Sequence, residues 1–431
     1  MFTPSLIVII LEGPSMREQQ ATEQQIRKAL AAAEPIILAP GPKEPPTQIP
    51  PVPNDVWDLP GGTAWVYHAE GSHQLTKPVI VADGFNMGPS NLDMLWQGLD
   101  WGQYAFFSEL RRRGHDIVLV GFHERSAAIQ QNAKAVIEAI NRSCKMRVGN
   151  HRLAVGGFSM GGLVTRYALT KMEHERIDHE TGLYWSYDTP HRGAWIPIGL
   201  QAFAHYSREL NSGFSDQINS DAARQLLAWH IEEWDGKPRM DELRERLLAE
   251  LERMGNWPAI PMKIGVANGV GTGQGNGIKP GDHTVEGKGL TILGTHLYAQ
   301  RSGDNQLVAK LRLVTPPPAK EVRTDDLPEF DGAPGGTLEG FGILADKLNE
   351  QPPILGLKTN ALIRHHSFVP SVSAVAIRDV TTNDDLYVNI DRLEPGTSEL
   401  DEFRLASQNE PHTLMTEELG GWIVEHIGNM S

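Results

Sequence analysis

The segment that most constrains the fold is Gly157-Phe158-Ser159-Met160-Gly161-Gly162, which joins an apolar run to a helix-forming one. Residues 153–158 predict a buried strand, and residues from 160 to about 171 predict a helix. Glycines let such a strand and helix approach closely, and the sharp turn exposes the serine hydroxyl to a base. The helix N-terminus also favours developing negative charge. The pattern therefore predicts an activated nucleophile at Ser159; the alternative is a Gly-rich turn with an inert serine.

Short strands and helices alternate on both sides of this turn. Strands are predicted at 63–68, 77–82, 116–120, 183–187 and 262–267, and helices at 103–114 and 126–140. Strands that alternate with helices indicate a mostly parallel sheet covered on both faces. We therefore expect an α/β fold.

Three further regions surround this core. Residues 1–55 predict an N-terminal helix (15–33) and a Pro-rich arm, because nine prolines fall between Pro35 and Pro60. The catalytic domain is expected to span 56–431. It contains a helical insertion at 193–258, with a charged amphipathic helix at 242–254, and a Gly- and Pro-rich insertion at 269–360. In the second insertion, residues 290–298 and 307–314 predict a hairpin.

The composition excludes several classes of partner. Lys and Arg number 39 against 54 Asp and Glu, which gives a net charge of -15. Such a surface repels phosphate backbones, so no nucleic-acid partner is expected. The single cysteine, Cys144, excludes an internal disulfide framework and a Cys-based metal cluster.

The only candidate targeting segment is the apolar run at residues 6–11. It is too short for a signal peptide or a transmembrane span, so we interpret it as a short strand or arm. A cytoplasmic protein without a membrane span is the resulting expectation. The sequence leaves open whether the chain forms a homo-oligomer.

The serine turn resembles the nucleophile elbow of the α/β-hydrolases. A second resemblance lies at Ser186-Tyr187-Asp188-Thr189-Pro190-His191-Arg192-Gly193-Ala194. It is similar to the T-P-H-x-G segment of bacterial lipases and of glycosylphosphatidylinositol-inositol deacylase relatives. These families carry an apolar lid immediately afterwards, which implies an α/β-hydrolase fold with a helical lid inserted after the sixth strand.

The resemblance also implies roles for particular residues. Trp195, Ile196 and Phe203 would belong to the lid and contact substrate, although the same apolar run is typical of ordinary core packing. His191 would be a structural residue between loops, with a ligand or catalytic role as the alternative.

Two backbone amides are the expected oxyanion hole. In this fold one donor is the N–H after the nucleophile, here Met160, and the other follows an early strand. The turn Ala82-Asp83-Gly84-Phe85 resembles the His-Gly-x turn of lipases, with Asp83 where histidine is usual. The Phe85 N–H is then the second donor; a plain Gly turn is the alternative.

The general base should come late in the chain, because this fold runs in the order serine, acid, histidine. His412 fits, since it lies in a loop directly before a helix predicted at 417–427. His365 and His366 are the competitors.

The acid is less constrained by sequence, since any carboxylate at a late strand end could orient the imidazole. Bacterial lipases supply it from a D-G-x-V-P-like turn, but the nearest match, His366-Ser367-Phe368-Val369-Pro370, lacks the aspartate. Asp188, which closes the strand at 183–187, is therefore favoured. Asp282 comes second, and Asp331 and Asp379 are more remote alternatives.

No cofactor or metal is predicted. His191, Asp282, His283 and His365 could contribute metal ligands, but no motif with tight spacing is present. The Gly-rich run at 269–275 lacks the spacing of a dinucleotide-binding loop.

The leading hypothesis is therefore a serine hydrolase that cleaves a small-molecule ester, lipid-like or otherwise acylated, through Ser159, His412 and Asp188. The alternatives are an acyltransferase or ring-closing enzyme that uses the same acyl-enzyme, and a non-catalytic binding protein on a hydrolase fold.

Overall fold

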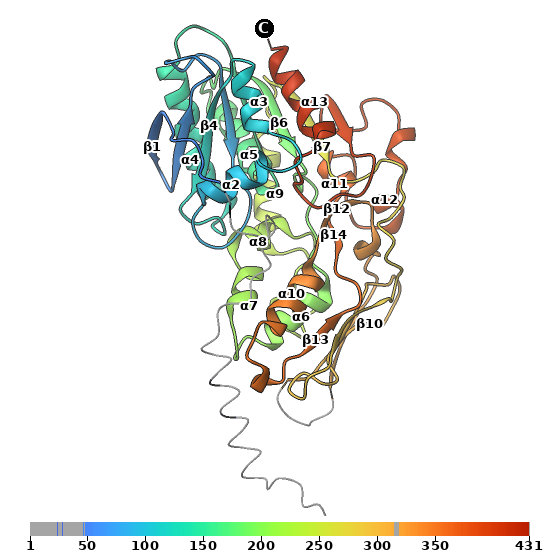
Figure 1. The fold of residues 1–431 in the computed structure, drawn as a ribbon. Coiled ribbons are helices and arrows are strands. Elements are labelled where there is room, and N and C mark those ends of the chain that lie inside the picture. Colours follow the sequence, from blue (N-terminus) through green and yellow to red (C-terminus); the bar gives the residue numbers. More distant parts are fainter. Residues whose placement is uncertain (1–23, 25–27, 29–45, 47, 314–318, 431) are drawn as a thin grey trace, which may run out of the picture.

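The computed structural model describes residues 24, 28, 46, 48–313 and 319–430 (Figure 1). The predicted helix at 15–33, the apolar run at 6–11 and most of the Pro-rich arm lie outside these residues. The described chain forms an upper part built on a large central sheet and a lower part that carries a second sheet.

The central sheet has eight strands in the order β1-β2-β4-β3-β5-β6-β7-β15. Its strands are β1 (Asp55–Leu59), β2 (Gly62–Tyr67), β3 (Pro78–Ala82), β4 (Asp116–Phe122), β5 (Leu153–Phe158), β6 (Thr181–Tyr187), β7 (Met262–Ala267) and β15 (Glu402–Leu405). β1 and β2 pair antiparallel at one edge, β2 is antiparallel to β4, and the remaining neighbours are parallel. This strand order, with β3 and β4 exchanged, is that of the α/β-hydrolase fold.

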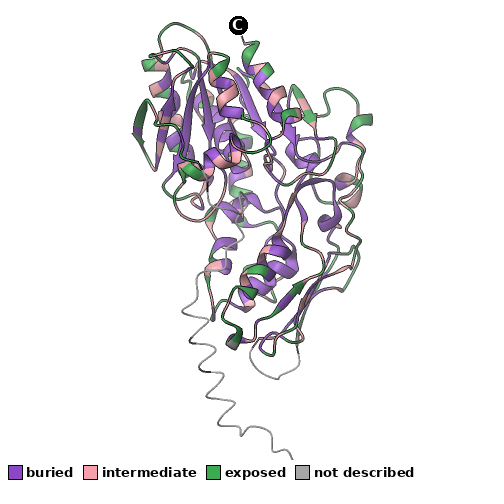
Figure 2. Cartoon of the chain, viewed as in Figure 1, coloured by how far each residue is buried: buried purple, intermediate pink, exposed green. Residues whose placement is uncertain are grey.

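Helices cover both faces of this sheet and bury it. α4 (Ile129–Met146) and α5 (Met160–His174) pack on one face, while α3 (Phe106–Arg112) and α13 (Glu417–Gly428) lie on the other with α2 (Leu92–Leu99). Every residue of β3 and β4 is buried, as Figure 2 shows for the strands at the centre of the upper part. Strands buried on both faces have continuous apolar sequences, and for this reason β3 and β4 could be predicted from the sequence.

The segment between β6 and β7 forms the predicted helical insertion. Its helices are α6 (Ile198–Tyr206), α7 (Gly213–Ile218), α8 (Asp221–Leu226) and α9 (Glu242–Met254). α9 has the bounds that its amphipathic pattern predicts, and Gly255 ends it in a left-handed conformation with φ 103°.

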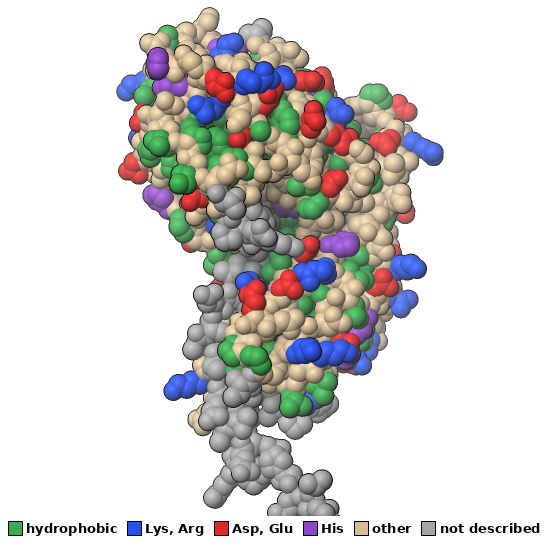
Figure 3. Space-filling view, viewed as in Figure 1, with side chains coloured by type: hydrophobic (Ala, Val, Ile, Leu, Met, Phe, Trp, Pro, Cys, Tyr) green, Lys and Arg blue, Asp and Glu red, His purple; other side chains and the backbone are tan. Residues whose placement is uncertain are grey.

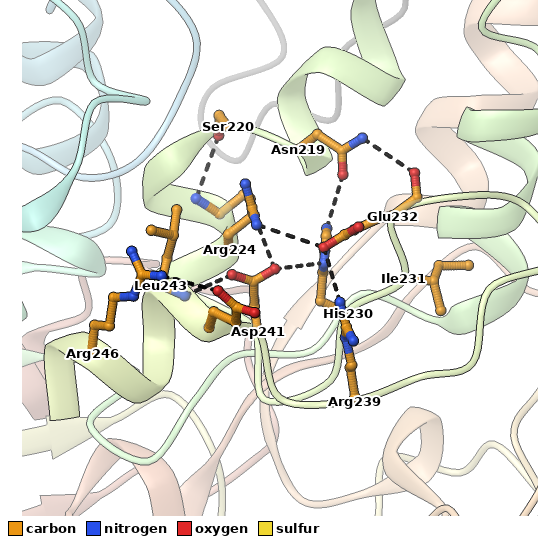
Figure 4. Close-up of polar contacts among 12 residues, drawn as sticks. Asn219, Ser220, Arg224, His230, Ile231, Glu232, Arg239, Asp241, Leu243 and Arg246 are labelled. Carbon is orange, nitrogen blue, oxygen red and sulfur yellow. Dashed lines mark hydrogen bonds and ion pairs between the residues drawn. The ribbon is translucent and has the colours of Figure 1, made fainter. Parts of the chain in front are cut away.

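A buried polar network holds this insertion together (Figure 4). The Asp241 carboxylate caps α9 through the Leu243 N–H (2.8 Å) and accepts from Arg224 Nε (2.9 Å). Its other contact is with His230 Nδ1 at 3.2 Å, while His230 Nε2 meets Asn219 Oδ1 at 3.0 Å. Because Asp241 is almost fully buried, its charge depends on these partners, and they tie α8 to α9.

The second insertion is larger than the predicted hairpin. The pairing of β9 (His296–Tyr298) with β10 (Gln306–Leu311) is that hairpin, and it lies inside a five-stranded antiparallel sheet, β11-β10-β9-β8-β13. The other members of this region are β8 (His283–Gly287), β11 (Lys320–Thr324), β13 (Thr359–Ala361), α10 (Gly340–Asn349), and the 3-10 turns at Phe330–Gly332 and Pro353–Leu355.

A two-stranded sheet lies between this insertion and the central sheet. β12 (Gly335–Leu338) pairs antiparallel with β14 (His366–Pro370), so the region extends past residue 360. Short helices then lead towards β15: α11 (Ser371–Ala374), α12 (Asn383–Leu386) and a 3-10 turn at Ile390–Arg392.

The surface mixes both charges. On the face in Figure 3, acidic and basic side chains are interspersed over the upper and lower parts. Within the described ranges, no helix is both long and apolar enough to cross a bilayer.

Candidate active site

Ser159 lies at the turn between β5 and α5. Its backbone has φ 53° and ψ -129°, a conformation that non-glycine residues rarely adopt and that costs free energy. A Cβ on Gly157 would lie 2.6 Å from the Gly161 carbonyl carbon, and a Cβ on Gly161 would lie 2.2 Å from the Ala82 oxygen. Both glycines are therefore required by the close approach of strand, helix and neighbouring turn.

His412 lies in the loop between β15 and α13, and its imidazole contacts both Ser159 and Asp188. Its Nε2 is 2.8 Å from Ser159 Oγ, and its Nδ1 is 2.7 Å from Asp188 Oδ2. An ionised carboxylate can only accept, so Nδ1 carries the proton and donates to Asp188. The Ser159 hydroxyl then donates to Nε2, which leaves the imidazole ready to receive its proton.

Asp188 follows β6 directly and is fully buried. Besides His412, its carboxylate accepts the Asn268 N–H at 3.0 Å through Oδ1. Asp188 and Thr413, which follows His412, also have positive φ (45° and 61°). Strained backbone therefore occurs at or beside each of the three residues, as is common where a site needs an exact geometry.

The competing residues lie elsewhere. Asp282 accepts the Lys279 N–H, and Asp331 accepts from Trp195 Nε1, whereas His412 bonds Asp188. His366 is buried in β14 beside the Ser367 oxygen, and burial lowers its pKa to about 3.

The second insertion helps to position the histidine and the acid, which the sequence did not reveal. The Thr337 oxygen of β12 accepts the His412 N–H at 2.7 Å, and the Phe368 ring of β14 packs edge-on against the imidazole, 4.8 Å between centroids. Gly336 lies so close to Asp188 that a Cβ there would be 2.0 Å from Oδ2. The adjacent Gly335-Gly336 pair was the one available signal, since neighbouring glycines often mark a close backbone approach.

The expected oxyanion donors border the nucleophile. A Cβ on Gly84 would lie 3.2 Å from Ser159 Cβ, so the turn after β3 rests directly on the serine. The Gly84 N–H donates to Asp83 Oδ1 at 2.6 Å. Phe85 lines the same cavity as Ser159, and Met160 is the first residue of α5, directly after the serine.

Asp83 is buried next to this turn. Burial raises the pKa of its carboxyl, while Arg125, Ser90 and the Gly84 N–H oppose that shift. Ser90 donates to its Oδ2 at 2.5 Å, and Arg125 Nη1 lies 4.0 Å away. These contacts fix the turn that carries Phe85.

Two cavities meet at His412. The smaller, of about 140 Å³, is lined by Asp83, Gly84, Phe85, Asn86, Asn91, Met94, Leu95, Gly98, Leu99, Arg125, Phe158, Ser159, His412 and Thr413. The larger, a groove of about 1080 Å³, runs between the end of α2, the His412 loop and α10. The groove and the small cavity share Gly98, His412 and Thr413.

The apolar run after β6 is packed as core in this structure. Trp195, Ile196 and Phe203 are all buried, and Trp195 stacks on Phe330 with centroids 4.3 Å apart. None of the three lines either cavity, so the substrate contacts expected for them are not part of this geometry. The tight fit between Trp195 and the second insertion explains the difference.

His191 is a buried residue near Ser186, whose Oγ lies 3.1 Å from its Nε2, and its ring packs against Trp257. Burial, with Arg166 and Arg192 nearby, lowers its pKa well below the usual value. Over the part of the chain that the structure describes, no group of three or more His, Cys, Asp or Glu side chains is arranged to hold a metal ion.

Comparisons with known proteins give no matching family model and no similar curated protein. Among solved structures, the chain is similar to the mature lipase BlEst2 of Bacillus licheniformis, with 13% identity, 50% of this chain and 72% of that chain covered, and a TM-score of 0.32. It is also similar to an esterase of Pyrobaculum calidifontis (13% identity, 58% and 73% covered, TM-score 0.32) and to Est1E of Butyrivibrio proteoclasticus (13%, 49% and 76%, 0.30). At these TM-scores the assignment to the α/β-hydrolase fold rests on the strand order of the central sheet.

Proposed function

We propose that the chain is a serine hydrolase that cleaves carboxylic esters. The observation that carries the proposal is the continuous hydrogen-bond chain from Ser159 Oγ through His412 to the buried Asp188 carboxylate. Its polarity is fixed, because the carboxylate can only accept. A hydroxyl held in this way at a strained turn is an activated nucleophile.

The direction of these hydrogen bonds sets the order of the proton transfers. Ser159 Oγ bonds to the acyl carbon as its proton passes to His412 Nε2, and the carbonyl oxygen becomes an anion near the Phe85 and Met160 amides. His412 then protonates the leaving alcohol oxygen, and the bond between that oxygen and the acyl carbon breaks. A water then attacks the acyl carbon of the acyl-enzyme and gives a proton to His412. The bond between the acyl carbon and Ser159 Oγ breaks, His412 returns the proton to Ser159 Oγ, and the acid leaves.

Asp188 stabilises the imidazolium that forms in both halves of the reaction and keeps the proton on Nδ1. Two backbone donors would be worth about 3 kcal/mol each at the transition state, because they are preorganised at a site largely shielded from water.

The experiment is intact-mass analysis after incubation with a fluorophosphonate. The wild type should gain one adduct, and Ser159→Ala should gain none. Ser302→Ala, which removes an exposed serine bonded to Glu329 and lines neither cavity, should keep the adduct and serves as the matched control. His412→Ala should label slowly. A folded wild-type protein that gains no adduct and does not hydrolyse p-nitrophenyl acetate would refute the proposal.

A further inference from the structure

The two cavities at His412 differ about eightfold in volume, at about 140 and 1080 Å³. Ser159 and the Gly84-Phe85 turn line only the smaller one, whereas both contain His412 and Thr413. An ester bound at Ser159 therefore has little space on one side and much more space on the other.

The chemistry of the proposed reaction assigns one half of the ester to each cavity. The acyl carbon bonds to Ser159 Oγ and its oxygen faces the Phe85 amide, so the acyl chain starts in the small cavity. The leaving oxygen must receive a proton from His412 Nε2 and therefore lies on the histidine side, where the groove opens.

The small cavity limits the length of the acyl chain. Its apolar wall comes from Phe85 and Phe158 and from Met94, Leu95 and Leu99 of α2. A protein cavity of about 150 Å³ with an apolar lining holds one benzene ring, which has six carbons. The 140 Å³ cavity therefore suits an acyl chain of up to about six carbons.

The groove accepts a much larger group, and its wall combines apolar side chains, among them Leu338, Ile343 and Leu414, with polar ones. It exceeds the volume of most pockets for drug-sized ligands, which reach about 1000 Å³. Gln97, Gln274 and Gln408 also line it, and their side-chain amides can donate to and accept from oxygen atoms of a ligand.

The charges along the groove are already paired. Arg364 contacts both Glu339 and Asp346, and Lys347 contacts Glu350, at the α10 side of the groove. A charged head group would have to compete with these pairs, so the lining favours an uncharged group.

We infer that the substrate is an ester between a short acyl chain, of up to about six carbons, and a large, uncharged alcohol. This inference rests on the proposed ester hydrolysis and adds to it the sizes of the two halves of the substrate.

The acyl half is tested with p-nitrophenyl esters from acetate to laurate. The kcat/KM should be highest at or below hexanoate and fall at least about tenfold by decanoate. Met94 is half-buried on the cavity wall, so Met94→Ala should move the optimum to longer chains and Met94→Trp should move it to acetate. Ile260→Trp, at an exposed position before β7 and thus at the opposite end of the parallel strands, is the matched control and should keep the wild-type profile.

The alcohol half is tested with acetate esters, comparing ethyl acetate with glucose pentaacetate and sucrose octaacetate. The ratio of kcat/KM for sucrose octaacetate to that for ethyl acetate should exceed one. Ile343→Trp, which places a larger side chain in the groove, should lower this ratio at least about fivefold.

The outcomes distinguish the inferred substrate sizes from the proposed ester hydrolysis. Hydrolysis of laurate faster than butyrate, or a sucrose ratio below one, would overturn the inference and leave the esterase proposal intact. No hydrolysis of any ester, together with no fluorophosphonate adduct, would overturn the proposed function itself.

Discussion

Gly336→Ala tests whether the second insertion sets the position of the acid. The new Cβ would lie 2.0 Å from Asp188 Oδ2, so the two must separate by about 1.4 Å to reach ordinary van der Waals contact at 3.4 Å. Asp188 has little freedom to yield, since the Asn268 N–H and His412 Nδ1 hold its two oxygens. Either the carboxylate or β12, which holds the His412 N–H, must move.

The expected cost follows from this displacement. A misplacement of about 1 Å in a catalytic group lowers the rate by about 10²-fold, or about 3 kcal/mol at the transition state. The upper limit is the loss of the carboxylate's role, about 10⁴-fold in kcat. The KM should change little, because Gly336 lines neither cavity.

The assay is the kcat for p-nitrophenyl acetate, with circular dichroism and thermal unfolding as evidence of a folded variant. Gly421→Ala is the matched control, since its Cβ would meet nothing closer than 3.8 Å. The effect should also be non-additive: Gly336→Ala should cost far less in an Asp188→Asn background than alone. A folded Gly336→Ala variant with wild-type kcat would refute the reasoning, and so would full additivity.

Three further predictions concern single residues. Asp188→Asn should lower kcat by about 10⁴-fold because the amide no longer fixes the Nδ1 proton, and steady-state kinetics would measure it; a loss below tenfold would contradict the assigned role. Burial raises the pKa of Asp331 from 3.8 to about 6, so at pH 5 the folded state holds a proton that the unfolded state has released. This contribution is fully present below about pH 4 and is lost, by roughly 3 kcal/mol, as the pH rises through 6. Urea unfolding should show that loss in the wild type and a smaller one in Asp331→Asn; equal slopes would contradict the prediction. Burial also raises the pKa of the Cys144 thiol to about 11, so iodoacetamide at pH 8 should label the folded protein slowly and the unfolded protein quickly.

The strand–turn–helix around Ser159 could be predicted from sequence because the interactions that form it are local. The apolar strand, the two close-approach glycines and the following helix lie within about twenty residues, and each type of residue has a local physical reason. The same holds for α9, whose amphipathic pattern and terminal glycine set its bounds. His412 could be proposed from chain order, since the loop before the last helix lies at the end of the sheet that carries the serine.

The sequence alone left four aspartates open for the acid. The parallel pairing of β6 with β7 and the return of the chain through β15 bring Asp188 to His412 across 224 residues of sequence. No local pattern encodes a separation of that length. The apolar run at Trp195 was ambiguous for the same reason, because a lid and a core segment have the same sequence pattern. Only the packing of Phe330 and Asp331 against Trp195 identifies the run as core.

The sequence by itself thus determined the nucleophile turn and the alternation of strands and helices, which depend on neighbours along the chain. Only the tertiary structure decided which aspartate meets the histidine, that β12 and β14 support both, and that the two cavities differ in size. These features depend on side chains from segments far apart in sequence, and close packing fixes their geometry only after the whole chain has folded.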